Sequence, residues 1–68
     1  MSVQVKLNGE PRDLPDGSTV ARAVAELTAA SSGVAAAVNG DVVPRGSRAA
    51  TPLRDGDQVE IVTAVQGG

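Results

Sequence analysis

The chain has 68 residues and a formal net charge of −2, and it contains no cysteine, histidine or aromatic residue. This length fits one small domain, which without cysteine or histidine has neither disulfides nor zinc to stabilise its thin core. The missing residue types also exclude thiol nucleophiles, histidine bases and aromatic stacking of nucleic-acid bases, and the acidic charge is opposite to that of nucleic-acid-binding domains.

We therefore expect no metal site and no nucleic-acid partner. No apolar stretch is long enough to span a membrane, so we expect no membrane association. No basic, apolar leader precedes the first strand-like segment, which indicates that there is no signal peptide. The absence of cysteine favours the reducing cytoplasm as the compartment.

The first segment reads as a hairpin. Residues 3–7 alternate apolar and polar side chains, which predicts a strand with one buried face. Asn8-Gly9 tolerates positive φ at both central turn positions and is a strong hairpin signal. Residues 10–14 are expected to form the returning strand. Because Pro11 has no N–H, this strand should lie at an edge of the sheet or be irregular there.

A helix is expected next. Asp16-Gly17 predicts a turn, and Ser18 or Thr19 can cap a helix. From Val20 onward, apolar residues recur at helical spacing. We expect this helix to end near residues 29–30, before a Ser-Ser-Gly run.

The second half predicts three more segments. Residues 34–38 are a continuous apolar run between Gly33 and an Asn-Gly turn, which favours a buried central strand. Residues 41–43 should pair back until Pro44 stops them. Residues 45–52 are interpreted as a loop. In residues 55–57, Asp-Gly-Asp is interpreted as a turn rather than a cation site, because no further ligands cluster there.

The last strand is the most regular. Residues 58–65 alternate, with two sets of side chains on opposite faces: Val59, Ile61, Thr63 and Val65 on one, and Gln58, Glu60, Val62 and Ala64 on the other. One helix packed on a mixed sheet of four to five strands is an α+β arrangement, the ubiquitin-like β-grasp. We predict a single β-grasp domain over residues 1–65 and a flexible Gly-Gly tail over residues 66–68.

The tail is the segment best suited to chemistry. A free α-carboxyl group has a pKa of about 3.3–3.7, so at neutral pH the Gly68 carboxylate is an anion that can attack a phosphoryl group. Gly67 has no Cβ, so Gln66-Gly67-Gly68 can enter a narrow active site. Two terminal glycines alone are equally typical of a frayed end.

Several short motifs occur in one order along the chain. They are Val-x-Val-x-Leu-Asn-Gly at 3–9, Thr19-Val20, Val38-Asn39-Gly40, Val43-Pro44-Arg45, Asp-Gly-Asp-Gln-Val-Glu-Ile-Val at 55–62, and Ala-Val-Gln-Gly-Gly at 64–68. In these motifs, over essentially its whole length, the chain resembles the sulfur carrier proteins of thiamine biosynthesis (ThiS-type), bacterial relatives of ubiquitin.

The resemblance implies a mechanism. An E1-like adenylyltransferase would use ATP and magnesium to convert the Gly68 carboxylate into an acyl adenylate. A persulfide enzyme would supply sulfur and leave a thiocarboxylate, from which thiazole synthase takes the sulfur. The chain would then be a protein co-substrate with no permanently bound cofactor, and not an enzyme.

Two alternatives stay open at this point. One is a sulfur carrier of molybdopterin or cysteine biosynthesis, since those carriers have similar folds and the same Gly-Gly end. The other is a non-catalytic β-grasp binding module. A one-residue extension after Gly68 should abolish the activity of a carrier and leave a binding module unaffected.

Two sets of surface residues have a functional and a plain interpretation. Val62 and Ala64, with Ala35 and Ala37, form either scattered surface apolar residues or a patch that docks a partner enzyme beside the tail. The three arginines of the second half are interpreted as a solvated face rather than as partners for acidic residues of another protein. They are Arg45, Arg48 and Arg54.

Overall fold

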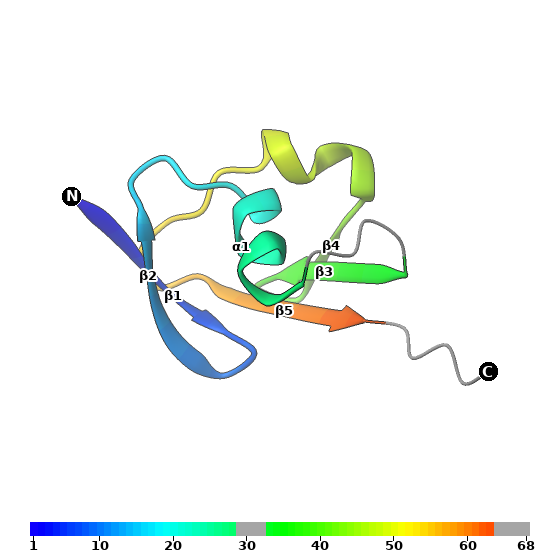
Figure 1. Cartoon of the computed structure of the whole chain (residues 1–68), viewed down its shortest axis with the longest axis horizontal. Coiled ribbons are helices and arrows are strands. Elements are labelled where there is room, and N and C mark those ends of the chain that lie inside the picture. Colours follow the sequence, from blue (N-terminus) through cyan, green and yellow to red (C-terminus); the bar gives the residue numbers. More distant parts are fainter. Residues whose placement is uncertain (29–32, 64–68) are drawn as a thin grey trace.

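A computed structural model describes residues 1–28 and 33–63 of the chain. Its elements, in chain order, are β1 (Ser2–Leu7), β2 (Glu10–Pro15), α1 (Val20–Leu27), β3 (Val34–Val38), β4 (Asp41–Val43), the 3₁₀-helix η1 (Arg45–Ala50) and β5 (Gln58–Thr63). The five strands form one sheet in the order β2-β1-β5-β3-β4, with α1 packed on one face (Figure 1). The β1–β5 pair is parallel and the other pairs are antiparallel. This confirms the predicted α+β β-grasp fold.

Both Asn-Gly pairs form the hairpin turns predicted for them. Asn8 and Gly9 have φ of 52° and 84°, and Asn39 and Gly40 have φ of 51° and 87°. Asparagine and glycine tolerate these left-handed values, which match the twist of the flanking strands. Pro11 lies in β2, an edge strand, as its missing N–H requires.

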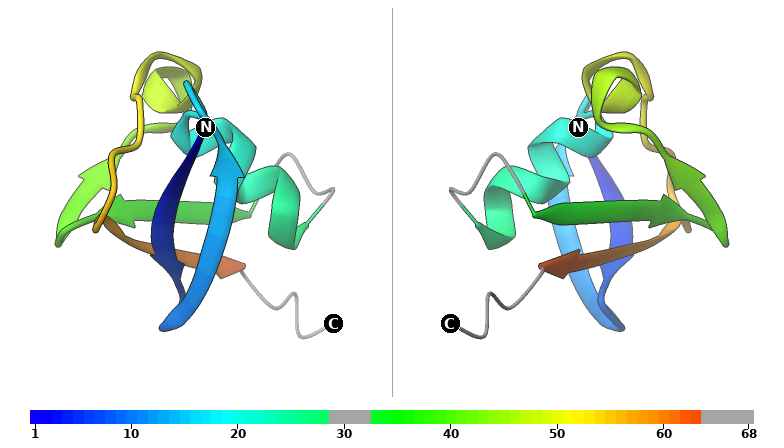
Figure 2. Two further views of the ribbon diagram at one scale, coloured as in Figure 1. Left: turned by 90° about the vertical axis from the view of Figure 1, so that its left-hand side faces the viewer. Right: turned by 90° about the vertical axis from the view of Figure 1, so that its right-hand side faces the viewer.

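The sheet is strongly twisted, so its two central strands pair only briefly. Strand β1 meets β5 at two registered pairs, Lys6 with Gln58 and Leu7 with Val59. Figure 2 shows β1 and β2 running steeply across β3 and β5. Beyond Leu7 the chain turns away into β2, while β5 runs on to Thr63 alongside β3.

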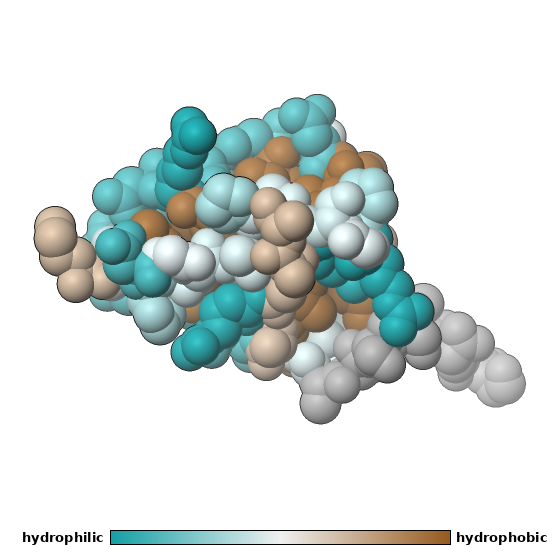
Figure 3. All heavy atoms as spheres, turned by 90° about the horizontal axis from the view of Figure 1, so that it is seen from above, coloured by the Kyte–Doolittle hydropathy of each residue, from teal (hydrophilic) through white to brown (hydrophobic). Residues whose placement is uncertain are grey.

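The hydrophobic core lies between α1 and the face of the sheet that it covers. Val59 and Val20 are completely buried, one on the central strand and one in the first turn of the helix. The rest of the core consists of Val3, Val5, Leu7, Leu14, Ala23, Val24, Ala36, Val43, Leu53 and Ile61. Seen from the side that carries α1 and η1, polar residues cover much of the surface and apolar atoms show between them (Figure 3).

The helix begins where predicted and ends early. Thr19 occupies the N-cap position, but neither predicted hydroxyl caps the helix. The Ser18 hydroxyl instead donates to the Pro15 carbonyl at 2.6 Å, and the Val20 N–H donates to the Thr51 carbonyl at 3.0 Å. A segment distant in sequence thus satisfies the first helical N–H. At the other end Thr28 is already extended, with φ of −153°, so the helix stops before residues 29–30, which lie outside the described residues.

The prediction of a loop over residues 45–52 is wrong, because residues 45–50 form η1. Pro44 starts this helix by accepting a hydrogen bond from the Ser47 N–H, and the Thr51 hydroxyl donates back to the Ser47 carbonyl at 2.7 Å. Arg48 anchors the segment, since its guanidinium donates to the Val34 carbonyl at the start of β3. Local polarity suggested a loop, but this long-range contact orders it.

Within the described part of the chain, no helix is both long and apolar enough to cross a membrane.

Candidate functional site

The predicted chemical site lies at the carboxyl end of the chain, and strand β5 leads to it. Gly68, Gly67, Gln66 and Ala64 lie outside the described residues. Strand β5 is paired on one edge with β3 from Val59 to Thr63 and on the other with β1 at Gln58 and Val59. The segment that precedes the predicted site is therefore the most central strand of the sheet.

Val62 is an exposed side chain on the face of the sheet opposite α1. It is 64% exposed, whereas Val59 and Ile61 on the other face are buried, so the predicted division of the two faces is correct for these three residues. Thr63, predicted to face the same way as Val59, is exposed at the strand end.

Other small apolar residues lie on the same outer face as Val62. Ala35 lies directly opposite Val62 in the β3–β5 register, and Ala37 lies opposite Val42 in the β3–β4 register. Val42 is 75% exposed. We call these four residues, Ala35, Ala37, Val42 and Val62, the outer apolar patch. Val42 was not among the surface residues predicted from the sequence, although the inward-facing Val43 next to it implies that Val42 points outward.

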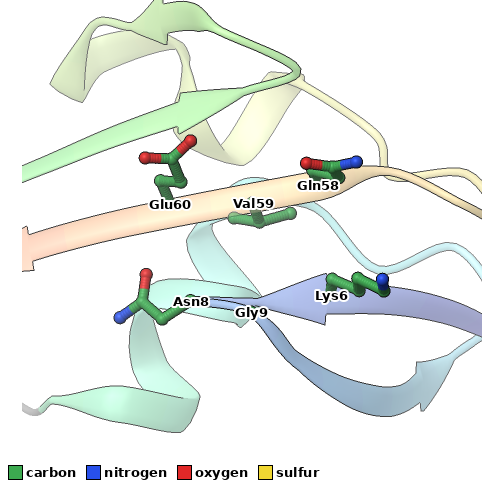
Figure 4. Close-up of a pocket in the computed structure, with 6 residues that line it drawn as sticks. All are labelled: Lys6, Asn8, Gly9, Gln58, Val59 and Glu60. Atoms are coloured by element: carbon green, nitrogen blue, oxygen red, sulfur yellow. The ribbon is translucent and has the colours of Figure 1, made fainter.

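A hollow of about 420 Å³ lies on the sheet where β1 and β5 separate. Figure 4 shows the residues that line it, which come from β1 and its turn (Lys6, Asn8, Gly9) and from β5 (Gln58, Val59, Glu60). The hollow contains one basic and one acidic side chain. A second hollow of about 330 Å³ adjoins it at Lys6 and extends to Pro11 and Asp55.

Asp55 and Asp57 hold a turn, as predicted, and their carboxylates are occupied by neighbouring donors. Asp55 accepts the Gln4 N–H at 2.7 Å, and Asp57 accepts the Arg54 N–H at 2.8 Å and the Asn39 side-chain amide at 3.0 Å. Across residues 1–28 and 33–63, no group of three or more histidine, cysteine or acidic residues is arranged to hold a metal ion.

The three arginines do not share one environment. Arg45 and Arg54 are exposed, which agrees with a solvated face. Arg48 is only 9% exposed, so the interpretation is wrong for this residue. Its Nε has no hydrogen-bond partner among the described residues, and the contact of its guanidinium with the Val34 carbonyl gives it a structural position under η1.

The chain was compared with known protein families, proteins and structures. The sequence model of the ThiS family matches residues 5–68, through to the terminal glycine. The sulfur carrier protein ThiS of Thermus thermophilus is 42% identical over 64 residues, which cover 94% of this chain and 98% of that protein. The crystal structure of the thiamine biosynthesis protein ThiS from Geobacter metallireducens matches with a TM-score of 0.75 and 29% identity, over 97% of this chain and 100% of that one.

Two longer proteins also match. Thiazole synthases of Paramagnetospirillum magneticum and Magnetococcus marinus are each 36% identical over 66 residues, which cover 97% of this chain but only 20% of theirs. For the two ThiS proteins, the match covers nearly the whole of this chain and nearly the whole of theirs. The chain belongs to the ThiS family, the sulfur carrier proteins of thiamine biosynthesis.

Proposed function

We propose that the Gly68 carboxylate is the group on which this chain carries sulfur. The observation that supports this most is that the family match runs through to Gly68, five positions after Thr63, the last residue of the central strand β5. A carboxylate oxygen attacks the α-phosphorus of magnesium-bound ATP, pyrophosphate leaves, and an acyl adenylate forms. An E1-like adenylyltransferase provides the active site for this step, and the carrier is its protein co-substrate. Because this activation consumes ATP, we propose that the carrier acts in the cytoplasm.

Sulfur transfer then follows by acyl substitution. The terminal sulfur of a persulfide enzyme attacks the activated carbonyl carbon of Gly68, and AMP leaves. A thiol reductant cleaves the resulting S–S bond, so that the carrier keeps one sulfur as a thiocarboxylate. Gly67 and Gln66 give the carbonyl access to narrow active sites, since a glycine beside the reacting residue puts no side chain in the channel.

The acceptor we propose is thiazole synthase. In two relatives of that name the matching region makes up 20% of the chain, so a domain similar to this carrier is part of the same polypeptide. Covalent linkage keeps the two domains at high effective concentration. A transfer between separate proteins needs a docking surface in place of this linkage.

The outer apolar patch, together with Ala64, is the docking surface we propose. Val62 on β5 and Val42 on β4 are 64% and 75% exposed. Ala35 and Ala37 lie on β3, the strand between β5 and β4. Exposed apolar residues gathered on one face of a small domain favour protein–protein contact. Val62 of the patch lies on β5, the strand that leads to the tail, so a partner held there would have Gly68 within reach of a short extended segment.

A chain with one alanine added after Gly68 tests the proposal. ATP–pyrophosphate exchange is measured with the cognate adenylyltransferase, for the wild type and for the extended chain. We expect exchange with the wild type and none above background with the extended chain, because its carboxylate is displaced and its last residue carries a Cβ. Unchanged exchange in the extended chain would contradict Gly68 as the reacting residue. Equal melting temperatures would show that the fold is intact.

A further inference from the structure

The sheet becomes narrow toward the end of β5. At Val59 the strand has β1 on one side and β3 on the other, but the β1 pairing ends there. Strand β4 pairs with β3 only from Ala36 to Val38. At the level of Val62 and Thr63, the described sheet therefore consists of β5 and β3 alone. A two-stranded ribbon is only marginally stable without further support.

The side chain of Asn8 supplies support at Ile61, one residue before this two-stranded part. Its Oδ1 accepts the Ile61 N–H at 2.8 Å, and its Nδ2 donates to the Ile61 carbonyl at 3.1 Å. Its own backbone N–H donates to the Val59 carbonyl at 2.9 Å. The side-chain amide thus takes the place of a further β1 residue and adds one rung to the ladder after the backbone has turned away. Figure 4 shows this side chain at the turn, facing β5.

The second Asn-Gly turn uses the same chemistry at the opposite end of β5. Asn39 Oδ1 accepts the Gln58 N–H at 3.0 Å, and its Nδ2 donates to the Asp57 carboxylate at 3.0 Å. Both asparagines have φ near 50° and both hold β5 through a side-chain amide. They differ in position, because Asn39 holds the start of the strand and Asn8 holds the part that leads to the tail.

We propose that Asn8 is a positioning residue that fixes the direction in which β5 presents residues 64–68 to a partner enzyme. The inference rests on the proposed function, since it concerns how the carrier end reaches an adenylyltransferase. If the strand end frays, only a fraction of molecules is competent to bind, and the apparent affinity falls by that fraction. The chemical step in the bound state is unaffected, because Asn8 does not touch the reacting carboxylate.

Asn8→Gly and Asn39→Gly are a matched pair for testing this. Glycine tolerates the positive φ of both turns, and each change removes two side-chain hydrogen bonds. Adenylation is measured as a function of carrier concentration, below the melting temperature of all variants. For Asn8→Gly we expect the KM for the carrier to rise by roughly three- to tenfold with kcat retained. For Asn39→Gly we expect the wild-type KM.

Hydrogen exchange supplies a second readout. In Asn8→Gly the Ile61 amide should lose protection while the Val5 amide keeps it, because the lost bond is local. If Asn8→Gly does not fold, Asn8→Asp replaces it. Aspartate keeps an acceptor for the Ile61 N–H but sets a carboxylate oxygen against the Ile61 carbonyl, so it should also raise KM.

The outcomes separate the two claims. Equal KM values for the Asn8 and Asn39 variants, or a lower kcat with unchanged KM in Asn8→Gly, overturn the positioning role while the wild type still reacts. A wild type that is not adenylated by a competent enzyme overturns the proposed function, and the inference with it.

Discussion

At the scale of residues, neighbours on one strand differ sharply in what they contribute. Ile61 is buried against the helix side of the sheet, and Val62, the next residue, is 64% exposed on the outer face. A strand turns successive side chains to opposite faces, so one strand can build the core and present a surface for a partner. Substitutions at the two positions should therefore act on different properties.

Val62→Ser should weaken partner binding and leave the fold intact. Burying the exposed part of a valine contributes about 1 kcal/mol, so we expect about a fivefold rise in the Kd of the complex with the adenylyltransferase or with thiazole synthase. Titration calorimetry measures the Kd, and thermal melting measures stability. The control is Leu27→Ser, since Leu27 is exposed on α1, away from the outer apolar patch. An unchanged Kd in Val62→Ser would contradict the docking surface.

At the scale of elements, the glycines of the turns have positive φ, whereas the glycine in η1 does not. Gly40 has φ of 87° in the turn between β3 and β4, whereas Gly46 lies within η1 without positive φ. A Cβ built at either position meets nothing within 4 Å. Because crowding is absent at both, only the backbone conformation distinguishes them.

Alanine at these two glycines should shift stability in opposite directions. Gly40→Ala should destabilise the fold by about 1–2 kcal/mol, the cost of a left-handed conformation for a residue with a Cβ. Gly46→Ala should stabilise it by about 0.4–1 kcal/mol, because alanine lowers the entropy of the unfolded chain. In a domain of this size each kcal/mol corresponds to about 4–8 °C in Tm, so thermal melting resolves both. A stabilising Gly40→Ala would contradict the turn geometry.

The same elements show what could be predicted from the sequence. The hairpins at Asn8-Gly9 and Asn39-Gly40 were predictable, because turn chemistry acts over two residues. The alternation of β1 and β5 likewise identified the buried Val59 and the exposed Val62. Local patterns determine these features, and the structure confirms them.

The features that the sequence did not predict depend on distant contacts. The η1 segment is ordered by Arg48, which reaches the Val34 carbonyl, and the helix N-terminus is satisfied by Thr51 rather than by its own cap. The two hydrogen bonds between Asn8 and Ile61 join residues 53 positions apart in the chain. A candidate Asn-Gly turn could be recognised locally, but its second function as a support for β5 could not.

At the scale of the whole molecule, the folded body holds the strand that leads to the tail, and the proposed chemistry takes place on the tail. The core, the two Asn-Gly turns and β3 together hold β5, and the outer apolar patch lies on the face away from α1. In the proposed function the body contributes binding and direction, and the only covalent changes take place at Gly68. In that proposal, partner enzymes bind ATP and magnesium and supply the sulfur and the catalytic groups.

The most direct test of this account is the intact mass of the carrier after incubation with its adenylyltransferase, magnesium, ATP, a persulfide donor and a thiol reductant. We predict a mass increase equal to the replacement of one oxygen by one sulfur, and fragmentation should localise it to Gly68. Omission of ATP should abolish the shift. An unchanged mass under conditions in which a known ThiS protein is converted, or a shift located on any other residue, would contradict the account.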